Sequence, residues 1–251
     1  ISSPQIGFLF FDLCVCLSRT LLFSVFDAIS KILKSILSLK LKFNVLYFNM
    51  DYNNILAVVL AGGKSQRFGE DKSQVKLNGK MLIDYILSEI IDEFNETLVV
   101  TNKPINFMKS NKIFTTKDFK EDLGPLGGIL SAMKWIKKNK KDYNWISTFP
   151  SDSPFFTKKE LKIFYEKIKI NKSKLFFVKS HKTIHNIFGL WSVDLIDRLE
   201  SDLLAGERKV EVWANSIGVN TIDIQYKNID PFFNINTRED LEKAISIKKN
   251  D

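Results

Sequence analysis

From residue 55 onward, short apolar runs alternate with segments whose apolar residues recur at helical spacing. Ile55–Leu60 is a six-residue apolar run, and Met81–Phe94 carries apolar side chains at 82, 83, 86, 87, 90, 91 and 94. The first pattern predicts a buried strand and the second an amphipathic helix. Repeated to the C-terminus, this alternation predicts an α/β fold, Rossmann-like, with a mostly parallel central sheet and helices on both faces. Ligands of such sheets bind at the carboxyl ends of the strands.

The remaining elements are expected at regular intervals along the chain. Further strands are predicted at Thr97–Thr101, Lys112–Thr115, Trp145–Phe149, Leu175–Val178, Ile187–Trp191 and Val219–Ile224. Further helices are predicted at Ile129–Lys138, Thr157–Ile170, Val193–Leu204 and Thr237–Ile247, with Gly124–Gly128 as a break in the chain before the first of them. Two of these helices begin with capping pairs, Thr157 with Glu160 and Thr237 with Asp240.

The first 49 residues differ in composition from the rest. They hold five basic and two acidic residues, and charged residues interrupt the apolar run, so no 18-residue uncharged span exists for a transmembrane helix. We expect residues 1–49 to be an N-terminal extension outside the fold, with the biological start at Met50 and one domain over 50–251. The alternative is an amphipathic membrane-surface helix around Ala28–Leu39.

The net charge and the numbers of cysteine and histidine residues limit the functions that this protein can have. The formal charge of +8 suits an anionic partner such as a nucleotide, a nucleic acid or a membrane surface. The lysines are scattered rather than gathered on one arm, which argues against nucleic-acid binding. The only cysteines are Cys14 and Cys16, so the body needs no oxidising compartment, and we expect a cytoplasmic protein. The only histidines are His181 and His185, which disfavours a multi-histidine metal site or a histidine-based hydrolase triad.

The segment from Leu60 to Lys72 reads Leu-Ala-Gly-Gly-Lys-Ser-Gln-Arg-Phe-Gly-Glu-Asp-Lys and leaves the end of the first strand. Gly62 and Gly63 lack a Cβ, so backbone N–H groups can approach phosphate oxygens closely. Arg67 and Lys72 add a forked and a compact positive charge that suit a polyphosphate. The spacing is neither a Walker A loop nor a Gly-x-Gly-x-x-Gly fingerprint. We predict a phosphate-binding loop; the alternative is an ordinary Gly-Gly turn with a solvated basic loop.

An acidic residue follows a later strand. Asp152 lies between Pro150 and Pro154, just past the expected strand that ends at Phe149. The two prolines present its carboxylate stiffly at the ligand crevice, and Mg²⁺ prefers such a carboxylate together with waters and phosphate oxygens. We predict a magnesium site at Asp152; the alternative is a turn residue that caps its own loop.

The glycine-rich segment resembles the Leu-Ala-Gly-Gly-x-Ser-x-Arg-x-Gly-x-Asp-Lys motif of molybdenum cofactor guanylyltransferases, which belong to the superfamily of nucleotide-sugar-type transferases. The resemblance covers about residues 55–247 and implies a Rossmann-like nucleotidyltransferase fold. It implies that GTP phosphates are held by this loop, through Leu60, Ala61, Gly62, Gly63, Arg67 and Lys72. The family's metal-binding Asp falls on Asp152, which implies Mg²⁺ as cofactor and a catalytic role for Arg67, Lys72 and Asp152.

Other family segments extend the resemblance. Gly124-Pro125-Leu126-Gly127-Gly128 matches a Gly-Pro-Leu-x-Gly element, and the nucleotide-contacting Asp upstream of that element falls on Asp118. The family commonly has Asn-x-Asn-Arg after the second strand, whereas this chain has Thr101-Asn102-Lys103-Pro104, so a nucleotide role of Asn102 is less firmly implied. The residues implied on the molybdopterin side are His185, Arg208, Asn234 and Asn236. A structural role for His185, and capping or turn roles for Asn234 and Asn236, are the alternatives.

The resemblance implies transfer of GMP from GTP to molybdopterin with release of pyrophosphate. It also implies molybdoenzyme apoproteins or other cofactor-biosynthesis proteins as partners. Two alternatives stay open. One is a CTP-dependent cytidylyltransferase of the same fold, although those enzymes usually carry Ala-Ala-Gly where this chain has Ala61-Gly62-Gly63. The other is a non-catalytic module that binds a nucleotide or carries the cofactor.

Overall fold

The computed structural model describes residues 29–35, 52–62, 75–120, 122–168 and 173–249. The chain divides into two compact units, Ile1–Phe48 and Asn49–Asp251. In the first unit, residues 29–35 are helical. Among the described residues, no helix combines the length and the apolar character that crossing a bilayer requires. The predicted phosphate-loop residues Gly63, Arg67 and Lys72 lie outside the described residues.

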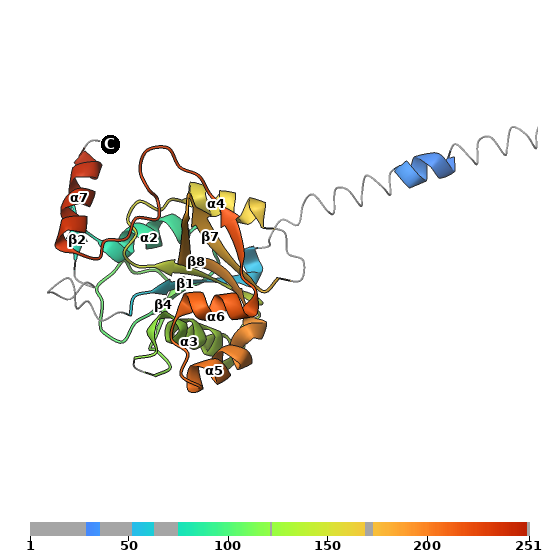
Figure 1. Cartoon of the computed structure of the whole chain (residues 1–251), viewed down its shortest axis with the longest axis horizontal. Coiled ribbons are helices and arrows are strands. Elements are labelled where there is room, and N and C mark those ends of the chain that lie inside the picture. The colour runs from blue at the N-terminus through green and yellow to red at the C-terminus, as the bar shows by residue number, and fades with distance from the viewer. Residues whose placement is uncertain (1–28, 36–51, 63–74, 121, 169–172, 250–251) are drawn as a thin grey trace, which may run out of the picture. The chain divides into compact units, whose positions relative to one another are not determined.

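The second unit is built on a seven-stranded sheet within the described residues (Figure 1). Its strands, in spatial order, are β5 (Ile113–Thr116), β4 (Thr97–Val100), β1 (Ile55–Leu60), β6 (Trp145–Pro150), β8 (Thr183–Ser192), β7 (Leu175–Ser180) and β9 (Asn220–Asp223). Strands β5, β4, β1 and β6 run parallel to one another, as do β7 and β9, while β8 is antiparallel to both of its neighbours. The predicted fold class is confirmed.

Helices cover both faces of this sheet (Figure 1). One face packs α2 (Leu82–Ile90) and α4 (Lys158–Lys167), and the other packs α3 (Gly124–Lys138), α5 (Ile196–Leu204) and α6 (Val210–Ile217). The last helix, α7 (Arg238–Lys249), lies by the small hairpin of β2 (Lys76–Leu77) and β3 (Lys80–Met81). Short 3-10 turns η1 (Tyr52–Asn54) and η3 (Val193–Leu195) precede β1 and α5.

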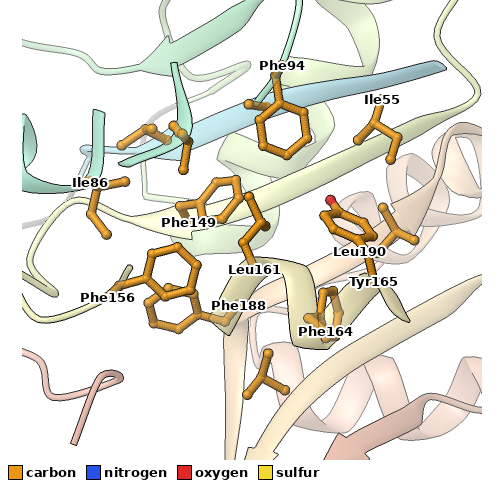
Figure 2. Close-up of a cluster of buried hydrophobic side chains, with 14 of the residues drawn as sticks. Ile55, Ile86, Phe94, Phe149, Phe156, Leu161, Phe164, Tyr165, Phe188 and Leu190 are labelled. Carbon is orange, nitrogen blue, oxygen red and sulfur yellow. The ribbon is translucent and has the colours of Figure 1, made fainter. Parts of the chain in front are cut away.

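Strand β1 shows why these residues form a central strand. Its alternate side chains point to opposite faces: Ile55, Ala57 and Val59 enter one core, whereas Leu56 and Val58 enter the other. All five are fully buried. The first core is rich in aromatic rings supplied by both the sheet and its helices (Figure 2). Burial on both faces requires a continuous apolar run, which is the pattern seen in the sequence.

One expectation about the elements was wrong, and two elements were not predicted. The Gly124–Gly128 segment does not break the chain before a helix; it forms the first turn of α3, with Pro125 at a position where its missing N–H costs nothing. A Cβ at Gly128 would lie 3.0 Å from Leu60 Cδ2, so this glycine permits close packing of α3 on β1. Helix α6 was not predicted, because its eight residues follow a basic segment without a capping signal. The β2–β3 hairpin was not predicted either.

Candidate functional site

Four parallel strands, β5, β4, β1 and β6, end at one edge of the sheet, and the segments that follow them carry Asn102, Asp118 and Asp152. Backbone hydrogen bonds continue the ladder past the strand ends: Ala61 N donates to Val100 O at 2.9 Å, and Thr101 N donates to Thr116 O at 2.9 Å. On the other side, Ser151 N donates to Leu60 O at 3.3 Å. The segment Leu60–Gly62 therefore lies between the Asn102 and Asp118 loops on one side and the Asp152 loop on the other.

Asp118 is held against the start of the glycine-rich loop. Asn102 Nδ2 donates to Asp118 Oδ2 at 2.8 Å, and Asp118 N donates to Asn102 Oδ1 at 2.9 Å. A Cβ added to Gly62 would lie 3.1 Å from Asp118 Oδ2, and one added to Gly128 would lie 3.3 Å from Oδ1. Burial raises the pKa of Asp118, and the hydrogen bond from Asn102 opposes that rise. The two glycines thus leave room for the carboxylate at the end of β1.

The Asp152 loop is joined to the segment that precedes α7. Ile235 N donates to Asp152 O at 2.9 Å, and Ser153 Oγ donates to Asn234 Oδ1. These two bonds bring Asn234 beside the loop that carries the predicted metal ligand. Asn236 differs, because its backbone N–H is taken by the Asp240 carboxylate at 2.9 Å at the start of α7. The structure therefore joins Asn234 to this loop and gives the backbone of Asn236 a capping contact.

Arg208 lies in the turn between α5 and α6. Its Nη1 donates to Leu203 O at 2.7 Å and to Glu207 O at 2.6 Å, so one guanidinium nitrogen is used on a carbonyl in the last turn of α5 and on one in the turn that follows. The backbone of Arg208 lies near the start of α3, since a Cβ on Gly124 would be 3.9 Å from Arg208 O. The residue is exposed at the start of α3, with part of its donor capacity bound to its own turn.

His185 is part of an aromatic group on the β7–β8 hairpin. Its Nε2 lies 2.6 Å from Ser180 Oγ, and its ring lies 4.7 Å from the ring of Phe232. Burial lowers the pKa of His185, and the negative charge of Asp230 partly opposes that effect. Phe232 is two residues before Asn234, so His185 supports the segment that reaches the Asp152 loop. The contacts of His185 are therefore packing contacts, and its role on the molybdopterin side stays a prediction.

Comparison with known proteins agrees with this geometry. The MobA-like NTP transferase domain model matches residues 57–218. The chain belongs to this family. A molybdenum cofactor guanylyltransferase from Rhizobium rhizogenes is 31% identical over 204 residues, which cover 78% of this chain and 94% of the relative.

Two solved structures share the fold of this MobA-like NTP transferase. Molybdopterin-guanine dinucleotide biosynthesis protein A from Archaeoglobus fulgidus matches with a TM-score of 0.60 at 23% identity, over 78% of this chain and all of that one. A 2-C-methyl-D-erythritol 4-phosphate cytidylyltransferase from Francisella tularensis matches with a TM-score of 0.56 at 19% identity, over 76% of this chain and 98% of that one. Proteins named for guanine and for cytidine chemistry therefore have this fold, and the fold alone does not choose the base.

The donor set at Asp152 fits a magnesium ion held partly by substrate. Within the described ranges, no three His, Cys, Asp or Glu side chains gather into a metal cage. Mg²⁺ bound with nucleotides usually takes only one or two carboxylates and completes its shell with waters and phosphate oxygens. A single carboxylate at a strand end, next to the start of the predicted phosphate loop, matches that type of site.

Two residues beside the site, Ser131 and Ser153, were not predicted from the sequence. Ser131 accepts a hydrogen bond from Phe119 N, next to Asp118, and Ser153 donates to Asn234. Both serines are buried, with exposed fractions of 5% and 0%. Serine is common in helices and turns, and neither position forms a motif by itself. The one available signal for Ser131 was a small polar residue on the otherwise apolar face of α3.

Proposed function

We propose that this chain transfers GMP from GTP to the terminal phosphate of molybdopterin, releasing pyrophosphate and forming the guanine dinucleotide of the cofactor. One observation carries the proposal: two carboxylates, Asp118 and Asp152, flank the Leu60–Gly62 segment at the end of β1 in a chain whose relative at 31% identity is named a molybdenum cofactor guanylyltransferase. The guanine base and molybdopterin are inferred from that relative's name, because the fold serves cytidylyltransferases as well.

On this proposal, the Asn102–Asp118 pair receives the nucleoside part of GTP. Asn102 donates one hydrogen bond to the Asp118 carboxylate and accepts one from the Asp118 backbone N–H, and Asp118 is partly buried, so its carboxylate is a prepared acceptor for a nucleoside N–H or O–H group. The first turn of α3 lies beside it, and the N-terminus of a helix favours negative charge. Leu60–Gly63 would supply backbone contacts to the phosphates.

The chemical step needs no nucleophilic side chain. An oxygen of the molybdopterin phosphate attacks the α-phosphorus of GTP, a new P–O bond forms, and the bond to the β-phosphate oxygen breaks as pyrophosphate leaves. We assign Arg67 and Lys72, on the family motif, to neutralise charge on the α-phosphoryl group and on pyrophosphate. Asp152 would hold Mg²⁺, which when bound supplies positive charge to the triphosphate oxygens. His185, Arg208, Asn234 and Asn236 are proposed for the pterin side.

We further propose a cytoplasmic location and delivery of the product to molybdoenzyme apoproteins or other cofactor-biosynthesis proteins. The support for location is that residues 50–251 contain no cysteine, so no disulfide ties the domain to an oxidising compartment. The support for delivery is the proposed reaction itself, because its product is a cofactor.

The test is pyrophosphate release by the full-length chain with molybdopterin and each of GTP, CTP, ATP and UTP, with and without Mg²⁺. We expect turnover with GTP that requires Mg²⁺, and loss of most of that turnover in Asp152→Asn. The matched control is Asp197→Asn, an exposed carboxylate on α5 that pairs only with Lys137 at 3.4 Å among the contacts described here. Turnover confined to CTP would assign the chain to cytidylyl transfer, and nucleotide binding without turnover would support the carrier alternative.

A second variant tests the phosphate loop. Lys72→Ala is expected to lower kcat by about 10²–10³-fold, the usual cost of removing one preorganised charge donor from a transition state. Lys103→Ala removes an exposed lysine from the loop that follows β4; it is the control and should keep kcat within about twofold. An unchanged kcat in Lys72→Ala would overturn the assignment of that residue.

A further inference from the structure

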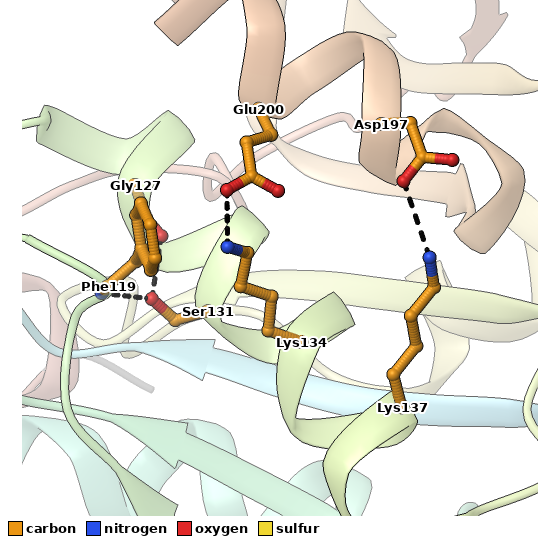
Figure 3. A network of polar contacts seen from close by, with 7 residues as sticks. All are labelled: Phe119, Gly127, Ser131, Lys134, Lys137, Asp197 and Glu200. Atoms are coloured by element: carbon orange, nitrogen blue, oxygen red, sulfur yellow. Dashed lines mark hydrogen bonds and ion pairs between the residues drawn. The ribbon is translucent and has the colours of Figure 1, made fainter. Parts of the chain in front are cut away.

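The residue that follows Asp118 is fastened to α3 through its backbone. Phe119 N donates to Ser131 Oγ at 2.5 Å, and Ser131 Oγ donates to Gly127 O at 2.8 Å, one turn earlier in the helix (Figure 3). A serine hydroxyl has one proton, and here the carbonyl of Gly127 takes it. An oxygen lone pair is thereby left to accept the Phe119 N–H. Because Ser131 is 5% exposed, water is a poor substitute for either bond.

The Phe119 side chain is held by the same face of the helix. Lys134 Nζ lies 3.6 Å from the centroid of the Phe119 ring, within the range of a cation–π interaction. The same ammonium group lies 2.5 Å from Glu200 Oε1 on α5, which fixes its position (Figure 3). Phe119 is 43% exposed, so burial in a core does not place this ring. Backbone and ring are instead located by two residues three positions apart on α3.

These contacts act on a carboxylate with little room to move. Asn102 holds Asp118 on its other side. The Asp118 carboxylate lies so close to the backbone of Gly62 and Gly128 that a Cβ on either glycine would crowd one of its oxygens. A shift of the peptide between Asp118 and Phe119 would therefore change where the carboxylate points. Groups that bind substrate act well only when their own positions are fixed by neighbouring contacts.

We propose that Ser131 is a positioning residue for Asp118, acting through the Phe119 amide to hold the carboxylate where it receives the nucleoside. The bond from Ser131 to Gly127 alone would be an ordinary helix contact of serine. The second bond is different, because it joins the helix to the loop after β5 and reaches the residue adjacent to the site. The part of this proposal that concerns GTP rests on the proposed function.

The first test measures the hydrogen bond from Phe119 N to Ser131 Oγ and does not depend on enzymatic activity. In amide hydrogen exchange on the full-length protein, the Phe119 amide should exchange at least about tenfold more slowly than that of Lys120, the exposed next residue, as expected for a hydrogen-bonded amide. In Ser131→Ala the Phe119 amide should exchange about tenfold faster than in the wild type. Equal exchange at Phe119 and Lys120 in the wild type would overturn the inference, even if the variant failed to fold.

The second test asks whether Ser131 acts through Asp118. Ser131→Ala is expected to raise the KM for GTP about tenfold, the effect of losing one hydrogen bond, with kcat within about twofold. In an Asp118→Ala background the same change should alter KM by less than about twofold, because non-additivity marks residues that act as a unit. Ser216→Ala is the control, since Ser216 Oγ also donates to a carbonyl of its own helix, α6, but Ser216 is itself exposed.

The outcomes separate this inference from the proposed function. A tenfold rise in KM that persists in the Asp118→Ala background would overturn the positioning role while leaving guanylyl transfer intact. A wild-type protein that neither binds nor turns over GTP would overturn the proposed function, and the Phe119 exchange rates would still decide whether Ser131 holds the loop.

Discussion

Asn102 and Asp118 exchange two hydrogen bonds across the ends of β4 and β5, at 2.8 Å from Asn102 Nδ2 to Asp118 Oδ2 and at 2.9 Å from Asp118 N to Asn102 Oδ1. The amide of Asn102 is thus fixed at both its donor and its acceptor. Because one bond goes to the carboxylate and the other to the backbone of the same residue, Asn102 sets both the place and the direction of the Asp118 side chain.

Loss of this pair should weaken nucleotide binding. Asn102→Ala removes both bonds, and we expect the KM for GTP to rise about tenfold or more, because a hydrogen bond to a charged group contributes about 1.5–3 kcal/mol. The matched control is Asn95→Ala, which breaks another exposed amide contact, from Asn95 Nδ2 to Asn53 Oδ1 at 2.9 Å, away from the strand ends. Steady-state kinetics over a range of GTP concentrations would measure both. Equal KM values in the two variants would contradict the role given to Asn102.

The Asp118 carboxylate should carry a cost in stability at neutral pH. Its folded-state pKa is raised by burial above the ordinary value of 3.8. The folded protein therefore holds this proton more firmly, so the associated stabilisation is complete below pH 3.8 and is lost as the pH rises through the folded pKa. We expect Asp118→Asn to unfold at a higher temperature than the wild type at pH 7, with a difference that shrinks as the pH falls toward 4. A difference that grew on acidification would contradict this sign.

Gly128 should tolerate no side chain. A Cβ there would lie 3.0 Å from Leu60 Cδ2 and 3.3 Å from Asp118 Oδ1, so Gly128→Ala must displace the Leu60 side chain, the carboxylate or both. Overpacking of this kind costs about 1–3 kcal/mol in the free energy of unfolding. Denaturant unfolding would measure that loss, and GTP titration should show weaker binding as well. A variant with wild-type stability and wild-type affinity would show that this contact has no role.

The sequence was sufficient to predict those elements whose burial dictates which side chains they carry. Ile55–Leu60 was predicted with its observed bounds, because a strand covered on both faces must be apolar at every position. The antiparallel placement of β8 was not predictable in this way. Its hairpin with β7 turns at His181 and Lys182 without an Asn-Gly signal, and His181 adopts the left-handed conformation at φ 50°.

The part of the site that could be predicted consists of residues that follow a strand or match a family motif. Asp118 was predicted by resemblance, and Asp152 by resemblance and by its position after a strand; the ladder of β5, β4, β1 and β6 brings both to one edge. The contacts of Ser131 could not be predicted, because its partner Phe119 lies twelve residues earlier, in a loop whose path depends on how α3 packs. Hydrogen bonds between segments follow from tertiary packing, which local propensity does not encode.

His185 should make the protein less stable on mild acidification. Burial lowers its folded-state pKa below 6.5, so its contribution to stability is present above pH 6.5 and is lost as the pH falls through the folded pKa. The loss cannot exceed the effect of one proton, about 1.4 kcal/mol per pH unit. His185→Gln keeps a polar group near Ser180 Oγ and removes the titration, so its unfolding free energy should fall less than that of the wild type between pH 6.5 and 5. Between pH 7.5 and 9 the two proteins should differ by a constant amount. Parallel curves across the acidic range would show that the proton on His185 is not linked to folding.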